Sequence, residues 1–258
     1  MTLAEHIDIN VLAKRTPGLV GADLANIANE AAIIATRLNH SKITMDDFEA
    51  AIDRILAGPE KKNRALNPEE KRRVAYHEAG HALVAENVPS GQPVHKISII
   101  PRGVSALGFT LQLPVEETFL STDAELKDQL AILHGGRVAE QIVLGSVSTG
   151  AQNDLERASE IARNMVCMLG MSKKVGALTL GKRQQLQFLD TEGTEYRNYS
   201  EETARLIDSE VLLLIEEAEA RATEIITTHR AVLDKLALVL QDKEVINRDE
   251  IIEVIAQS

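Results

Sequence analysis

The chain has 258 residues, which is enough for one large domain or two smaller ones. Its composition, 44% hydrophobic and 26% charged, is that of a soluble globular protein, and the low aromatic content of 3%, beside many Ala and Leu, predicts a mainly helical fold. A net charge of −11 argues against a nucleic-acid partner, because phosphate binding requires a basic surface. The single cysteine, Cys167, excludes an internal disulfide, and no apolar run approaches the roughly 18 residues that cross a membrane.

The first 57 residues predict a small helical unit. Thr44 and Asp47 have the spacing of a capping box, in which each side chain binds the backbone of the other residue at a helix start. Three segments of this unit have helical spacing: residues 10–15, 21–38 and 44–57.

A break follows this unit. Gly58 and Pro59, followed by a charged run, are typical of a domain boundary, so we predict a linker over residues 58–67 and a second, mostly helical domain with a short β-sheet over residues 68–258. We expect the double glycine at 135–136 to interrupt one helix of this domain. The predicted helices cover residues 68–87, 122–134, 137–144, 153–169, 200–229 and 230–240, and the predicted strands cover residues 95–100, 107–113 and 176–181.

The most informative pattern is His-Glu-Ala-Gly-His at residues 77–81. On a helix, His77 and His81 lie one turn apart on the same face, so both imidazoles can bind one Zn²⁺ ion. Glu78 then lies beside the first ligand, where it can take a proton from a metal-bound water during peptide hydrolysis. Asn67, followed by a proline and two acids, is a good helix start, which predicts that the motif lies inside a helix.

A catalytic zinc usually has three protein ligands, so a third ligand must come from another element. A third histidine six residues after His81 is excluded, because that position is Asn87. Two carboxylates are candidates: Glu140, on the helical segment after the double glycine, and Asp154, at a predicted helix start. The residues themselves leave these two alternatives open.

Further segments, taken with the zinc motif, form a pattern that is more specific than the motif alone. They are Leu12-Ala13-Lys14-Arg15-Thr16-Pro17-Gly18, Gly21-Ala22-Asp23-Leu24-Ala25-Asn26, Ala51-Ile52-Asp53-Arg54, Ala57-Gly58-Pro59-Glu60-Lys61-Lys62, Pro93-Val94-His95-Lys96, Ile99-Ile100-Pro101-Arg102-Gly103, Gly135-Gly136-Arg137, Ser148-Thr149-Gly150-Ala151 and Asn153-Asp154-Leu155-Glu156. With these segments the chain resembles, over nearly its whole length, the FtsH family of bacterial and organellar membrane-bound AAA+ zinc proteases.

The resemblance implies one Zn²⁺ ion per chain, with Asp154 as the third ligand and Glu140 as a supporting residue near the site. It also implies a mostly helical peptidase domain of the M41 type. In this family an extended edge strand beside the metal helix is thought to bind the substrate backbone by strand addition. The candidates for that strand are Leu107, Gly108, Phe109 and Thr110.

The resemblance further implies that residues 1–57 are the small helical lid of an AAA+ ATPase, with Gly21 and Ala22 close to the nucleotide. The chain has no Gly-x-x-x-x-Gly-Lys-Ser/Thr loop, so the phosphate cradle and the transmembrane helices of the family are expected upstream, in a longer protein of which this chain is a C-terminal fragment. ATP and Mg²⁺ would then act only in the full-length protein.

Together these features predict the zinc-dependent endopeptidase part of an ATP-dependent protease, with Glu78 as general base. The family implies unfolded, short-lived and membrane proteins as substrates, a homohexamer, and a place at the cytoplasmic face of the inner membrane or at an organellar membrane, attached through segments absent from this chain. Two alternatives are a stand-alone, ATP-independent zinc metallopeptidase and a non-catalytic ring scaffold with a structural metal helix. His134 and Val138 depart from the family pattern, which has apolar residues and Ala there.

Overall fold

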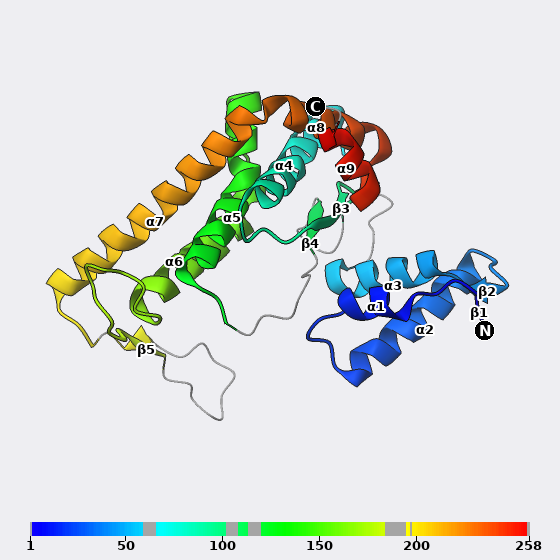
Figure 1. Cartoon of the computed structure of the whole chain (residues 1–258), viewed down its shortest axis with the longest axis horizontal. Coiled ribbons are helices and arrows are strands. Elements are labelled where there is room, and N and C mark those ends of the chain that lie inside the picture. The colour runs from blue at the N-terminus through cyan, green and yellow to red at the C-terminus, as the bar shows by residue number, and fades with distance from the viewer. Residues whose placement is uncertain are drawn as a thin grey trace. The chain divides into compact units, whose positions relative to one another are not determined.

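The computed structural model describes residues 2–58, 66–101, 108–112, 120–183, 195–196 and 198–256. Over these residues the fold is mainly helical with small β-sheets, which confirms the predicted fold class (Figure 1). Contacts divide the chain into two compact units, one of Met1–Glu78, Gln92–Glu117 and Leu236–Ser258 and the other of Ala79–Gly91 and Thr118–Lys235. Helix α4, Pro68–Asn87, contributes to both units. The predicted domain limits stay a prediction, and most of the predicted linker lies outside the described residues.

Three helices form the first part of the chain, as the sequence predicts. They are α1 (Ile9–Lys14), α2 (Gly21–Arg37) and α3 (Met45–Ala57), and the short strand β1 (Thr2–Leu3) pairs in parallel with β2 (Lys42–Ile43). Thr44 starts α3 through a reciprocal cap: its hydroxyl accepts from the Asp47 backbone N–H at 3.3 Å, and the Asp47 carboxylate accepts from the Thr44 N–H at 2.8 Å. The buried core of these helices consists of Ile27, Ala31, Ala35, Ile43, Phe48, Ala51 and Ile52.

A three-stranded antiparallel sheet has the order β4-β3-β7. Its strands are β3 (Val94–Ser98), β4 (Phe109–Gln112) and β7 (Val245–Asn247), and helix α9 (Arg248–Ala256) follows β7 directly. The sequence predicts β3 and β4 but not β7 or α9. In the described part of the chain, β4 is an edge strand with one side unpaired.

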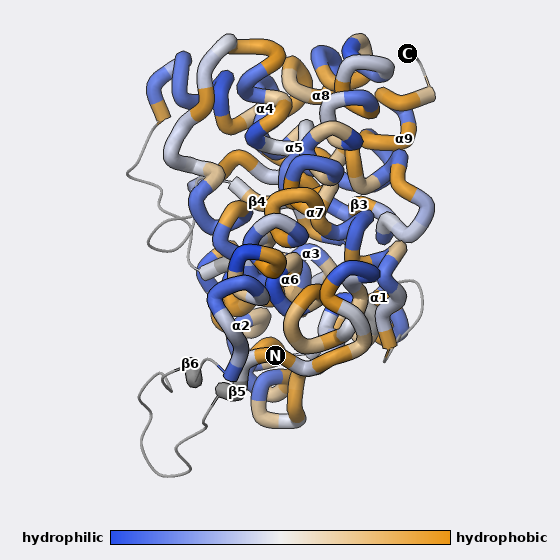
Figure 2. Tube along the Cα trace, turned by 90° about the vertical axis from the view of Figure 1, so that its left-hand side faces the viewer, coloured by the Kyte–Doolittle hydropathy of each residue, from blue (hydrophilic) through white to orange (hydrophobic). Residues whose placement is uncertain are grey.

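Long helices form the second unit. Helix α5 (Asp123–Leu144) packs against α6 (Gln152–Cys167) and α7 (Glu201–Thr228), and the 3₁₀ helix η1 (Thr149–Ala151) precedes α6. Helix α8 (Arg230–Lys243) follows α7 and contributes to both units. Hydrophilic and hydrophobic residues alternate along single helices (Figure 2), so each helix has an apolar side to bury. Two buried clusters result, one of Leu130, Leu133, Ala158, Ala162, Met165 and Ala218 and one of Val166, Cys167, Val175 and Ile207. Among the described residues, no helix is both long and apolar enough to cross a membrane.

Two local predictions are wrong. Residues 176–181 form no strand; a short strand β5 (Lys182–Arg183) follows them and pairs with β6 (Glu195–Tyr196). The double glycine at 135–136 does not interrupt a helix, because α5 continues through it to Leu144. The packing of α4 against α5 explains why glycine is needed inside this helix.

The backbones of α4 and α5 touch at Gly80 and Gly135. A Cβ atom on Gly80 would lie 2.4 Å from the Gly135 carbonyl oxygen and 2.7 Å from Cβ of Ala139. A Cβ atom on Gly135 would lie 2.7 Å from the Gly80 carbonyl oxygen. Since real Cβ atoms do not approach backbone this closely, both positions require glycine, although glycine weakens a helix.

We expect Gly80→Ala and Gly135→Ala each to lower the free energy of unfolding by about 1–3 kcal/mol, because the added methyl group overpacks the contact and forces the helices apart. Denaturant unfolding followed by circular dichroism measures this change. Gly21→Ala is the matched control. A Cβ atom on Gly21 would have no atom of the described residues within 4 Å, so this substitution should leave stability unchanged or raise it. Equal stability of all three variants would contradict the close contact.

Candidate metal centre

Helix α4 carries the His-Glu-Ala-Gly-His motif in its buried middle. The helix starts at a side-chain cap, in which the Asn67 Oδ1 accepts from the Glu70 N–H at 2.8 Å. Residues 74–85 are all buried, so the helix is covered on every side where the motif lies. His77, Glu78 and His81 are only 8%, 7% and 9% exposed. Buried polar side chains of this kind require partners, and for Glu78 and His81 these come from strand β4 and helix α5.

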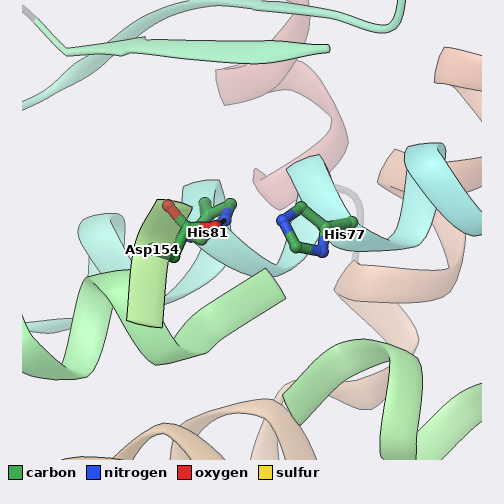
Figure 3. Close-up of side chains that lie close together, drawn as sticks. All are labelled: His77, His81 and Asp154. Atoms are coloured by element: carbon green, nitrogen blue, oxygen red, sulfur yellow. Dashed lines mark ion pairs between the residues drawn. The ribbon is translucent and has the colours of Figure 1, made fainter. Parts of the chain in front are cut away.

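The ring of His81 has a fixed orientation. Its Nδ1 lies 2.8 Å from the backbone carbonyl oxygen of Ile132 on α5. A carbonyl oxygen only accepts hydrogen bonds, so Nδ1 carries a proton and Nε2 is the nitrogen that a neutral ring can offer to a metal. This Nε2 lies 3.3 Å from the Oδ2 of Asp154 (Figure 3).

His77, His81 and Asp154 converge (Figure 3). Each offers one ligand atom, and these atoms lie within 4.8 Å of one another. Among the described residues, this is the one group of three or more His, Cys, Asp or Glu side chains with metal-ligand spacing. Two imidazoles and one carboxylate are a donor set that suits a catalytic zinc. The residues therefore fit zinc, and zinc binding at this place stays a prediction.

Glu140 is the alternative third ligand that the sequence left open, and it lies outside this group. It is 1% exposed on α5 and accepts a hydrogen bond of 3.0 Å from the Ser148 hydroxyl. Ser148 is the N-cap of η1, where its Oγ also accepts from the Gly150 N–H at 3.2 Å. Glu140 thereby fixes the segment that leads into α6, whose first turn contains Asp154. The role of Glu140 as a supporting residue of the site stays a prediction.

Glu78 faces strand β4. The Thr110 hydroxyl lies 3.0 Å from the Glu78 Oε2 and 3.2 Å from the Glu78 backbone oxygen. A Cβ atom on Gly108 would lie 2.7 Å from the Glu78 Oε1. Two of the four residues predicted for the substrate strand therefore contact the predicted general base, a relation that sequence spacing gives no sign of.

The other predicted site residues lie at the starts of elements or outside the described residues. Gly21 and Ala22 are exposed at the start of α2, and their nucleotide-proximal role stays a prediction. Leu107 lies outside the described residues, and Phe109 is the first residue of β4. His95, on β3, is surrounded by charges of the first part of the chain; burial and then the positive charge of Arg15 lower its pKa.

His134 is a buried histidine whose environment the sequence did not predict. It is 2% exposed, and neither ring nitrogen has a hydrogen-bond partner among the residues that the structure describes. Burial is the main cause that lowers its pKa below the usual 6.5, and the positive charge of Arg137 acts in the same direction. The negative charges of Glu219 and Asp154 oppose this effect. The folded protein therefore favours the neutral form of His134 over the charged form.

Comparison with known proteins gives matches to both parts of the chain. Residues 64–254 match the model of peptidase family M41, and residues 6–50 match that of the AAA+ lid domain. The chain is 67% identical over 258 residues to the ATP-dependent zinc metalloprotease FtsH of Methylococcus capsulatus. It is 54% identical over 255 residues to the protein of the same name from Thermotoga maritima, and 53% identical over 253 residues to that from Pseudothermotoga lettingae.

These alignments cover 100%, 99% and 98% of this chain. They cover 40%, 42% and 40% of the three relatives, so the chain spans about two fifths of the length of the curated proteins it matches.

We expect Asp154→Asn to weaken zinc binding by more than the roughly 10–100-fold that loss of an outer-sphere partner costs, because it removes a charged ligand. Competition with a chromophoric chelator measures the affinity. Glu156→Gln, an exposed acid on the same helix, is the matched control and should bind zinc like the parent. Equal affinity of the Asn and Gln variants would exclude Asp154 as a ligand.

We expect the metal-free protein to lose stability as the pH falls through about 6.5, since the unfolded chain takes up a proton on His134 that the folded chain does not. His134→Leu should flatten this dependence and raise the free energy of unfolding by about 1–3 kcal/mol, the cost of a buried unpaired polar group. Unfolding at pH 5, 6 and 7 measures both effects. His6→Leu, at an exposed histidine, should leave the pH dependence as in the parent.

Proposed function

Because this chain belongs to peptidase family M41, we propose that it is the zinc-dependent endopeptidase part of an ATP-dependent protease. The observation that carries this proposal is the convergence of the His77, His81 and Asp154 ligand atoms, together with a glutamate next to the first histidine on the same buried helix. A structural zinc site needs ligands but has no use for Glu78, which favours catalysis over a scaffold role.

Each side chain has a distinct task in this proposal. His77, His81 and Asp154 would hold a zinc ion, and the Ile132 carbonyl leaves Nε2 of His81 as the ligand atom. Zinc held there would supply Lewis-acid polarisation of the peptide carbonyl and would lower the pKa of a water molecule to about 7. Glu78 accepts the proton of the attacking water and passes a proton to the leaving amine. Burial of these groups strengthens their electrostatic interactions, because little water competes.

Strand β4 is the proposed substrate site. Its inner side pairs with β3, with Thr110 opposite Ile97, and its outer side is unpaired in the described part of the chain. An extended peptide can add to that side through main-chain hydrogen bonds, which gives affinity with little sequence preference. The proposed strand residues are Gly108, Phe109 and Thr110, with Leu107 before them.

The proposal extends to a longer protein that contains this chain. We infer an upstream ATPase module to which the AAA+ lid belongs, with ATP and Mg²⁺ bound there and Gly21 and Ala22 facing the nucleotide. The proposal includes a homohexamer with one zinc per chain, unfolded, short-lived and membrane proteins as substrates, and attachment at the cytoplasmic face of the inner membrane or at an organellar membrane. The names of the relatives, ATP-dependent zinc metalloproteases, and the length they have beyond this match support it.

Glu78→Gln tests the proposal. We expect the variant to bind zinc like the parent and to lose about 10²–10⁴-fold in cleavage rate, because the amide cannot accept the proton. An unstructured fluorogenic peptide is the substrate, since it needs no unfolding by an ATPase. Zinc content is measured on the same samples.

Glu69→Gln, at an exposed acid in the first turn of the same helix, is the control and should cleave like the parent. Cleavage by Glu78→Gln at the parent rate would exclude Glu78 as the base. A zinc-loaded parent that cleaves no unstructured peptide would count against the function itself.

A further inference from the structure

Strand β4 contacts Glu78 from two positions. The Thr110 hydroxyl is 3.0 Å from the Glu78 Oε2, and a Cβ atom on Gly108 would be 2.7 Å from the Glu78 Oε1 and 2.8 Å from its Cγ. Alternate residues of an extended chain point to the same face, so positions 108 and 110 both face α4. One position gives the carboxylate room, and the other gives it a hydrogen-bond donor.

We propose that Thr110 is a positioning residue for Glu78, whose hydroxyl holds the carboxylate in one orientation against the bare backbone of Gly108. The inference rests on the proposed function, in which Glu78 is the general base. A catalytic base must stay within about 0.5 Å of its productive place, and a glutamate side chain has enough rotatable bonds to leave it. A hydroxyl donor fixed on a strand restricts that freedom.

The same strand thereby has two tasks. Its backbone is the proposed edge for the substrate, and its Thr110 side chain holds the base. Thr110 is paired with Ile97 of β3, so the position of its hydroxyl is fixed by the sheet. A peptide added to the outer side of β4 would lie in a fixed register relative to the carboxylate that must act on it.

A purely structural role for the hydroxyl is the competing explanation. The Thr110 Oγ1 is also 3.2 Å from the backbone oxygen of Glu78, and one hydroxyl has a single hydrogen to share between the two acceptors. A bond to the backbone alone would stabilise the packing of β4 on α4 without any effect on the base. The experiment must therefore separate the side-chain acceptor from the backbone acceptor.

Kinetics on the zinc-loaded chain give the first readout. Thr110→Val keeps the shape and removes the hydroxyl, and Thr110→Ser keeps the hydroxyl. We expect Thr110→Val to lower kcat about tenfold and to leave KM nearly unchanged. This loss is smaller than the roughly 10²–10⁴-fold that a general base contributes, because Glu78 itself is still present. The Ser variant should restore most of kcat. Thr223→Val, which removes an exposed hydroxyl bonded to the Glu219 backbone oxygen on α7, is the matched control.

Unfolding of the metal-free chain gives the second readout and needs no activity. Thr110→Val should lower the unfolding midpoint by about 2–4 °C, the shift expected for one hydrogen bond in a chain of this size. In a Glu78→Ala background the same substitution should shift the midpoint by less than half as much, because the side-chain acceptor is gone.

Equal midpoint shifts in both backgrounds would show that the hydroxyl serves only the backbone oxygen, and the inference would be wrong. A parent-like kcat for Thr110→Val, with or without coupling to Glu78, would overturn it as well. Failure of the proposed function has a different signature, which is cleavage by Glu78→Gln or no cleavage by the parent. The unfolding experiment still decides in that case whether Thr110 holds the carboxylate.

Discussion

The close backbone contact between α4 and α5 is the constraint on which the rest of the site depends. At Gly80 and Gly135 neither helix has a side chain, and a single methyl group on either would collide with the other backbone. The short distance allows the Ile132 carbonyl to reach Nδ1 of the His81 ring, which leaves Nε2 as the nitrogen on the side of Asp154. The same helix α5 carries Glu140, which fixes the segment before Asp154 through Ser148. The two glycines thus determine where α4 and its His81 ring lie relative to α5.

Features with a local cause were predictable from the sequence. Helices α3, α5 and α7 begin one residue after Thr44, Thr122 and Ser200, because each cap is formed by side chains within one turn. The histidine pair is also local, since helical spacing alone puts both rings on one face. The mainly helical fold class followed from the same patterns, summed over the chain.

Features that depend on distant partners were not predictable. In the sequence, the double glycine at 135–136 is typical of a helix break. In the structure α5 continues through it, and the packing of α4 against Gly135 explains the glycine. Strand β7 is three residues long and obtains its conformation from pairing with β3. The choice between Glu140 and Asp154 depends on how α4, α5 and α6 pack, so the residues left it open and only a family resemblance favoured Asp154. The contact of Thr110 with Glu78 likewise exists only once β4 is paired with β3.

During synthesis, strand β7 is made long after β3, the strand with which it pairs. Ile97 and Ile246, which are paired across β3 and β7, lie about 150 residues apart, so a ribosome needs roughly 7–30 s to make the second after the first. Until then β3 and β4 form a two-stranded hairpin, which is marginally stable in water. A nascent chain therefore contains helix α4 before the sheet beside Glu78 has its third strand. Completion of this sheet is thus a late step in the folding of the chain, although β3 and β4 are made early.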